Sequence, residues 1–261
     1  MLNIRDIAIT YGGNSIPTVE GVSLEMNQGE IVSIVGESGS GKTTVIRAVL
    51  GCLPGGGRVI RGQIQFEGTD LGSLSRDAWR SLRGSSISMI FQDSGAMINP
   101  IRKIGPQYVE YIRTHQRISK KGAWDKGVEM LERMRLPNGD NIMRSYPFQL
   151  SGGMRQRVGI AMAMTFQPRL LLADEPTSAL DVTTQAQIVR QLLELRDTYH
   201  TAVLLVTHNL AVAAYMADHI VVMRGGRITD QGDREHLLRS EEPYTRQLLR
   251  AVPDLGGARY V

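Results

Sequence analysis

Cysteine is nearly absent from this sequence: Cys52 is the single one in 261 residues. A lone thiol excludes a disulfide within the chain and leaves too few sulfur ligands for a cysteine-based metal centre. Because Cys52 follows an apolar stretch, we expect it to be an inert residue of the hydrophobic core.

The sequence also lacks long hydrophobic runs and a strong charge of one sign. No apolar run approaches the roughly 18 residues that span a bilayer, and the first residues have neither the basic nor the apolar region of a signal peptide. The net charge is +4 and the basic residues are spread along the chain, which argues against nucleic-acid binding. We therefore expect a cytoplasmic protein that reaches a membrane only through a partner.

The composition is that of a globular protein, with 42% hydrophobic and 21% charged residues. Short, continuous apolar runs are typical of strands buried on both faces of a parallel sheet, and they occur at 31–35, 170–173, 203–206 and 220–223. Between two of them, residues 185–196 carry apolar side chains at helical spacing. This alternation predicts an α/β fold.

Two regions depart from the alternation. Residues 93–166 have a mostly helical pattern, which predicts a helical subdomain inserted into an α/β core formed by residues 1–92 and 167–240. Near the start, Leu2, Ile4, Ile7 and Ile9 indicate antiparallel edge strands. No Gly/Ser-rich linker marks a boundary, so residues 1–261 are expected to form one domain with a C-terminal tail at 241–261.

A glycine-rich loop lies between an expected buried strand and an expected helix. The loop consists of Gly36, Glu37, Ser38, Gly39, Ser40, Gly41, Lys42 and Thr43, and Thr44 follows it. This spacing is a P-loop, in which backbone N–H groups surround phosphate oxygens at a helix N-terminus. Lys42 would reach the β- and γ-phosphates and the Thr43 hydroxyl would bind Mg²⁺, so the sequence predicts an ATP site.

Two adjacent acids, Asp174 and Glu175, end the apolar run at 170–173. Carboxylates at this end of a strand lie where ligands bind in open α/β sheets. Asp174 is expected to hold Mg²⁺, and Glu175 to polarise an attacking water. Taken alone, the pair would equally well cap the next turn; the P-loop upstream favours the catalytic interpretation.

Two further polar residues follow expected strands. His208 comes directly after the run at 203–206 and Thr207, and its position favours a contact with the γ-phosphate, although a lone histidine is more often structural. Gln92 follows an apolar segment, and its amide could touch both Mg²⁺ and the attacking water. Without its context, Gln92 would be taken for an ordinary loop residue.

A second anion site is predicted at Ser151, Gly152 and Gly153. Ser151 is a good N-cap for the helix expected to run through 158–166, and the two glycines expose backbone N–H groups. Because one P-loop already satisfies one nucleotide, this helix end suggests a nucleotide held by another subunit. That hypothesis predicts ATP-dependent dimerisation.

These motifs, in this order, resemble the ATP-binding cassette (ABC) ATPases over the whole chain. Residues 36–43 resemble the Walker A motif, 170–175 the Walker B motif, and 150–154 the signature motif. The resemblance implies a head-to-tail dimer that holds two ATP molecules between the Walker A motif of one subunit and the signature of the other. It also implies that Glu175 is the general base and that His208 holds the γ-phosphate.

Three more residues carry the resemblance. Gln92 is similar to the Q-loop glutamine, Asp181 ends a segment similar to the D-loop, and Tyr11 resembles the aromatic residue that stacks on adenine. ATP and Mg²⁺ are the implied cofactors.

Several segments resemble the peptide/nickel importer branch of this family, namely Tyr146-Pro147 and residues 91–93, 152–157, 160–163, 174–181 and 243–249. Such importers typically join two different ATPase subunits, two membrane permeases and an extracytoplasmic binding protein, which implies a peripheral position at the cytoplasmic face of the membrane. Many oligopeptide members end in a cysteine-containing tail that this chain lacks, so a nickel or metal-chelate importer is weighed equally with a peptide importer.

Contact with a permease is expected in the helical insert. Met97, Ile98, Ile101, Tyr108 and Tyr111 could line a groove for a permease helix, or equally pack the insert's own core. The alternative to transport is an ABC-type ATPase that acts in DNA repair or in regulation. The DNA-acting members need coiled-coil or zinc insertions for which this chain has no room.

Overall fold

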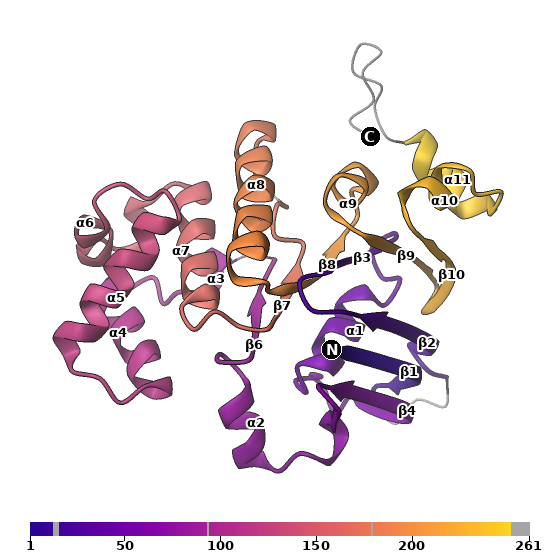
Figure 1. The fold of residues 1–261 in the computed structure, drawn as a ribbon, viewed down its shortest axis with the longest axis horizontal. Helices are drawn as coiled ribbons and strands as arrows, with labels where there is room; N and C mark the ends of the chain where they lie inside the picture. Colours follow the sequence, from indigo (N-terminus) through magenta and orange to yellow (C-terminus); the bar gives the residue numbers. More distant parts are fainter. Residues whose placement is uncertain (13–15, 93, 179, 252–261) are drawn as a thin grey trace. The chain divides into compact units, whose positions relative to one another are not determined.

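The computed structural model describes residues 1–12, 16–92, 94–178 and 180–251 (Figure 1). They form two units: one combines Met1–Trp79 with the chain from Ala202 onward, and the other is Arg80–Thr201. Among the described residues, no helix is long and apolar enough to cross a membrane. Asp93, Ala179 and residues 252–261 of the predicted segments lie outside the described residues.

The first unit contains three of the predicted parallel strands. β3 (Ile31–Val35) lies between β8 (Ala202–Thr207) and β9 (His219–Arg224) and runs parallel to both, and β10 (Arg227–Gly232) pairs with β9 in the antiparallel sense. Every residue of β3 and β8 is buried, as expected for strands covered on both faces. The prediction of buried parallel strands is confirmed for these runs.

An antiparallel sheet also belongs to the first unit. β1 (Leu2–Thr10) pairs with β2 (Val19–Met26) and β4 (Arg58–Phe66), and β5 (Thr69–Asp70) pairs with β4. Leu2, Ile4, Ile7 and Ile9 are all buried. The buried positions change from even to odd residue numbers between Ile4 and Ile7, where the register shifts. Asp6 lies in this interval with a positive φ of 45°, as in a β-bulge. The expected antiparallel edge is confirmed.

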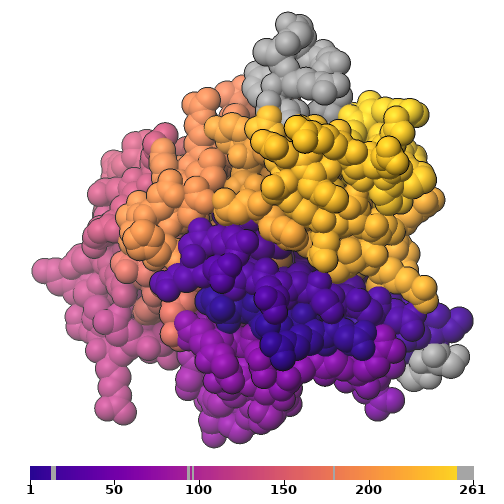
Figure 2. Space-filling model, turned by 45° about the vertical axis from the view of Figure 1, so that its right-hand side comes forward, coloured from indigo at the N-terminus to yellow at the C-terminus, as the bar shows by residue number. Residues whose placement is uncertain are grey.

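Segments from the beginning and from the last described part of the sequence lie side by side in the first unit, as the indigo and orange-to-yellow surfaces of Figure 2 show. The Glu20 amide donates to the Gly226 carbonyl at 2.8 Å, and the Gly226 amide donates to the Ser40 carbonyl at 3.1 Å. The turn between β9 and β10 therefore joins the antiparallel sheet to the glycine-rich loop.

Helices of the first unit pack against strands of both its sheets. They are α1 (Lys42–Val49), α9 (Leu210–Met216), α10 (Arg234–Leu238) and α11 (Pro243–Arg250), with the 3₁₀ turn η1 (Leu71–Ser73) and the start of α2 (Arg76–Leu82). One core cluster contains Val35, Leu210, Val222 and Tyr244, so the C-terminal helix α11 shares a core with β3.

The second unit is mostly helical around β6 (Ile87–Ile90) and β7 (Leu170–Asp174), which pair in parallel. Its helices are α3 (Ser94–Met97), α4 (Ile104–His115), α5 (Lys120–Arg133), α6 (Gly139–Arg144), α7 (Gly152–Met164) and α8 (Val182–Tyr199), with the 3₁₀ turn η2 (Pro147–Gln149). The predicted helix at 185–196 lies within α8. The fold class, an α/β core with an antiparallel edge and helical insert, is confirmed.

The expectation that Cys52 is a core residue was wrong, and the two alternatives left open for Tyr108 are resolved. Cys52 is exposed, because the chain leaves α1 after Val49 and turns at Gly51, which has a positive φ of 64°. Tyr108 is fully buried and its hydroxyl lies 2.8 Å from the Thr165 hydroxyl, so it packs the core of the helical unit and cannot line a groove.

The other residues of the expected groove divide in the same way. Ile98 is buried and Tyr111 donates to the Gly84 carbonyl. Met97 and Ile101 are exposed, at 63% and 83% of their surface. Of the five residues, Met97 and Ile101 are therefore the ones whose large apolar side chains are exposed.

Candidate functional site

The glycine-rich loop turns tightly between β3 and α1. Gly36 has φ 155° and Gly41, the N-cap of α1, has φ 99°. A Cβ on Gly36 would lie 2.1 Å from the Met223 carbonyl oxygen, and one on Gly41 would lie 2.8 Å from a Val19 methyl. Both the backbone conformation and the close approach of neighbouring chain require glycine at these positions.

Lys42 directs its charge into the loop. Its ammonium donates to the carbonyls of Gly36 at 2.8 Å and Glu37 at 2.7 Å, and to the Ser40 hydroxyl at 3.4 Å. Lys42 is only 4% exposed. A buried cation surrounded by loop backbone at a helix N-terminus fits an anion with several oxygens.

Tyr11 lies against the same helix. Its hydroxyl donates to the Thr44 hydroxyl at 3.4 Å, and its ring lies so close to Gly57 that a Cβ there would approach a ring carbon to 2.5 Å. The structure therefore brings Tyr11 to the first turn of α1, where Thr43 and Thr44 are half-buried.

His208 reaches the same edge of the parallel strands as the loop. Val35 at the end of β3 is paired with Thr207 at the end of β8. Gly36 and His208 directly follow these two residues, so both leave the sheet at the same edge. His208 is exposed, and the following Asn209 caps α9 through the amides of Ala211 and Val212. The strand register thus delivers His208 to the carboxyl edge, as predicted.

In the second unit, Gln92 and Glu175 come together. Ile90 of β6 is paired with Ala173 of β7. Gln92 and Glu175 each lie two residues further along the chain, and the Gln92 amide donates to a Glu175 carboxylate oxygen at 3.4 Å. Asp174 is 4% exposed at the end of β7. Glu175 has a positive φ of 46°, which is uncommon for a residue with a side chain and is typical of functional turns.

Two residues hold this turn in place, and sequence reasoning gave neither of them that role. The Ser178 hydroxyl donates to the Glu175 carbonyl at 2.9 Å, and the Gln156 amide donates to the Pro176 carbonyl at 2.7 Å. Gln156 belongs to α7 and is 5% exposed. The sequence offers no local signal for this contact, because the burial of the Gln156 amide, which makes a partner necessary, is visible only in the structure.

The second predicted anion site has the expected helix start. Ser151 caps α7, its hydroxyl accepting from the Met154 amide at 3.2 Å. Ser151 and Gly152 are exposed. A Cβ on Gly153 would lie 2.7 Å from a Thr184 methyl, so glycine there lets α7 approach α8.

Asp181 has a structural role within its own chain. Its carboxylate caps α8 by accepting from the Thr184 amide at 2.9 Å and the Thr184 hydroxyl at 2.7 Å. These hydrogen bonds, the hydroxyl's first, hold the pKa of Asp181 below its ordinary value. Its predicted contact with nucleotide remains a prediction.

A family model described as "ABC transporter" matches residues 19–178, more than half of the chain. The dipeptide transport ATP-binding protein DppD of Haemophilus influenzae is 42% identical over 97% of this chain and 78% of its own length. The chain belongs to the ABC transporter family. The oligopeptide transport ATP-binding protein OppD of Bacillus subtilis is also 42% identical, over 98% of this chain and 72% of its own length.

Solved ABC structures support the same assignment. A dimeric ATP-binding cassette in a post-hydrolysis state, bound to ADP and Pi, has a TM-score of 0.79 and 27% identity, covering 90% of this chain and 99% of its own. As an ABC transporter subunit, this chain is an ATPase whose ATP hydrolysis is coupled to transport. These matches give no support to the alternative of an ATPase outside transport.

The residues present fit ATP and Mg²⁺. The loop after β3 is a cradle that a Cβ at Gly36 or Gly41 would fill, and Lys42 supplies a buried cation. Within the described residues there is no cluster of three histidines, cysteines or acids that would bind a metal by itself. Each of the three predicted ligands, Thr43, Gln92 and Asp174, offers an oxygen of the kind that Mg²⁺ binds, and Mg²⁺ takes its remaining ligands from waters and phosphates.

Proposed function

We propose that this chain lies at the cytoplasmic face of the membrane and energises the import of peptides into the cell. The observation that carries the proposal is its 42% identity, along nearly the whole chain, to ATP-binding proteins named for dipeptide and oligopeptide transport. Nickel or metal-chelate uptake is the alternative, because several segments resemble the peptide/nickel importer branch as a whole.

In the proposed ATPase cycle, residues of one chain bind ATP and a second cassette completes the site. Lys42 holds the β- and γ-phosphates with the loop amides, Tyr11 stacks on adenine, and His208 contacts the γ-phosphate. Ser151, Gly152 and Gly153 would bind the phosphates of ATP held by the other cassette, with Asp181 nearby.

Hydrolysis is assigned to the turn that follows β7. Glu175 acts as the general base, and its hydrogen bond to Gln92 supports a shared role in placing the attacking water. Thr43, Gln92 and Asp174 would hold Mg²⁺, which neutralises charge that develops on the phosphate oxygens.

Coupling to a permease is proposed for the helical subdomain at residues 93–166. Met97 and Ile101 support this proposal because both side chains are exposed and so are accessible to a permease helix. Residues 1–92 and 167–240 would be the ATPase core and 241–261 the tail.

Isolation of the native complex tests the function. The chain is tagged, purified gently from membranes and analysed for bound proteins. Recovery of two permeases and a second cassette subunit, with peptide-stimulated ATP hydrolysis when the binding protein is added, is the expected result. Stimulation by a nickel chelate and not by peptides would replace the cargo assignment; recovery without permeases would overturn transport.

A further inference from the structure

The C-terminal helix α11 contacts the P-loop directly. The Glu37 backbone N–H donates to the hydroxyl of Tyr244 at 2.7 Å. Tyr244 is the second residue of α11, in the segment 243–249 that the sequence analysis singled out and that ATP hydrolysis leaves unexplained. A residue 207 positions later in the chain therefore accepts a hydrogen bond from the second residue of the loop.

This bond fixes one particular peptide group. The carbonyl of Gly36 and the N–H of Glu37 belong to the same planar unit. The Gly36 carbonyl accepts from the Lys42 ammonium at 2.8 Å, while the Glu37 N–H donates to Tyr244. The peptide plane is thus held at both ends, by the phosphate-binding lysine on one side and by the tyrosine hydroxyl on the other.

Tyr244 is itself held rigidly. It is 3% exposed, and it packs in the core cluster that contains Val35, the last residue before the loop. The Arg224 guanidinium lies 4.9 Å from its ring centre. Burial raises the pKa of the Tyr244 hydroxyl, so it stays uncharged at neutral pH. A fixed, neutral oxygen is a suitable acceptor for a backbone N–H.

Asp230 anchors the helix that carries Tyr244. The Thr245 hydroxyl donates to the Asp230 carboxylate at 2.9 Å, the Ser240 hydroxyl donates to the same oxygen, and His236 lies 3.0 Å from the other oxygen. These contacts tie β10, α10 and α11 together. The hydrogen bond of Tyr244 links this anchored helix to the loop.

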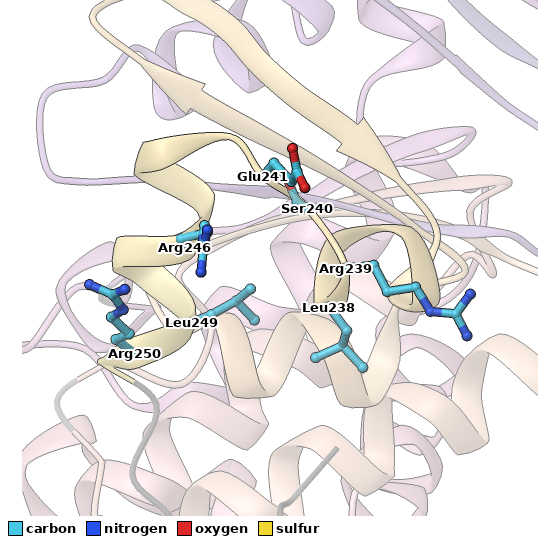
Figure 3. Close-up of a pocket in the computed structure, with 7 residues that line it drawn as sticks. All are labelled: Leu238, Arg239, Ser240, Glu241, Arg246, Leu249 and Arg250. Atoms are coloured by element: carbon cyan, nitrogen blue, oxygen red, sulfur yellow. The ribbon is translucent and has the colours of Figure 1, made fainter.

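The opposite side of α11 borders a polar pocket of about 340 Å³ (Figure 3). Arg246, Leu249 and Arg250 of α11 line it together with residues 238–241. The helix therefore has one side in the core, where Tyr244 reaches the loop, and another at this open pocket.

We propose that Tyr244 is a positioning residue for ATP binding, whose hydroxyl holds the peptide between Gly36 and Glu37 in the orientation that the Lys42 ammonium requires. The proposal rests on the proposed role of residues 36–43 as the ATP site. Without the hydroxyl, that peptide is held only at its carbonyl end, by Lys42, and the entropy cost of fixing its orientation opposes ATP binding.

The test compares Tyr244→Phe with Tyr108→Phe in the full chain. Both variants lose one hydroxyl of a buried tyrosine, but the Tyr108 hydroxyl lies beside Thr165 in the helical unit. Tyr244→Phe should raise the Kd of ATP about 3- to 10-fold, the worth of one hydrogen bond. In the transporter purified with its permeases, KM for ATP should rise while kcat stays within about twofold of wild type, because the turn at Glu175 is untouched.

Each outcome decides between the hypotheses. Wild-type affinity in Tyr244→Phe, or an equal loss in Tyr108→Phe, overturns the positioning role. A wild-type chain that binds no ATP would instead refute the proposed nucleotide site. If Tyr244→Phe does not fold, amide exchange in the nucleotide-free wild type still decides: the Glu37 amide should exchange measurably more slowly than an unprotected amide, and free exchange contradicts the proposal.

Discussion

Two helices of this protein begin at glycine-rich segments that suit phosphate, yet their first turns differ. At α1 the N-cap is Gly41, which has no side chain to cap the helix. The buried Lys42 ammonium lies within the loop and donates hydrogen bonds to its carbonyls. At α7 the Ser151 hydroxyl caps the helix, and Ser151 and Gly152 are exposed.

The difference supports the proposal that the two helix ends are complementary halves of one kind of phosphate site. The loop before α1 is enclosed by its own chain, with Val19, Met223 and Gly226 packed around its glycines. The start of α7 presents its glycine and cap to solvent. A helix N-terminus of the second kind offers N–H groups to an anion that another molecule brings.

Glu175→Gln should block ATP hydrolysis without preventing ATP binding. It would therefore hold the protein at the step in which the two helix ends meet around ATP. ATP turnover should fall roughly 10²- to 10⁴-fold, the usual contribution of a positioned general base, while ATP affinity is kept. Turnover and equilibrium binding are measured on the same preparation. Glu194→Gln, which alters an exposed acid paired with Arg135, is the control and should retain full turnover.

Lys42→Ala tests the enclosed half. Loss of a charged donor to phosphate should weaken ATP binding by about 10- to 100-fold, since hydrogen bonds to charged groups contribute about 1.5–3 kcal/mol. Titration with a fluorescent ATP analogue measures the Kd of each variant. Lys126→Ala removes a lysine of the helical unit and should leave the affinity unchanged; equal losses in both variants would refute the assignment.

Gly152→Asp tests the exposed half. Among the described residues, a Cβ here meets only a Leu180 methyl at 3.9 Å, so the side chain fits, and an acid in the first turn favours the helix. The new charge should repel a phosphate and lower turnover at least about tenfold without loss of thermal stability. The single chain should still bind ATP.

Gly152→Asn is the matched control, because it has the same shape without the charge. Asparagine should cost much less turnover than aspartate. Equal losses would show that size, and not repulsion of an anion, explains the effect.

Ser151→Ala is the smallest change. Removal of an N-cap side chain should lower the free energy of unfolding by about 1 kcal/mol, and differential scanning calorimetry would show it as a fall of about 2–4 °C in Tm. Thr114→Ala, which alters an exposed hydroxyl bonded within α4, should change Tm less. An unchanged Tm in Ser151→Ala would mean that the cap contributes nothing.

The parts of the site that could be predicted follow local rules. A strand, a glycine turn and a helix place Lys42, and a buried run that ends in acids places Asp174 and Glu175. The Ser151 cap follows from the preference for serine before a helix. The register of parallel strands then brings His208 and Gln92 to strand ends, since β3 pairs with β8 and β6 with β7.

What could not be predicted depends on contacts between distant residues. Tyr108 and Tyr244 are tyrosines on amphipathic helices, and nothing local distinguishes the one that packs the helical core from the one that reaches the P-loop. Cys52 follows an apolar helix, and its exposure depends on where the chain turns. The positive φ of Glu175 is likewise set by its neighbours, Ser178 and Gln156.

The most direct test of the two-halves account is sedimentation of Glu175→Gln, with the cassette subunit that copurifies with it, in the presence and absence of ATP and Mg²⁺. We predict that two cassettes associate when ATP is bound, and that adding Gly152→Asp prevents the association. Full occupancy of the P-loop by ATP with the cassettes remaining apart would contradict the account.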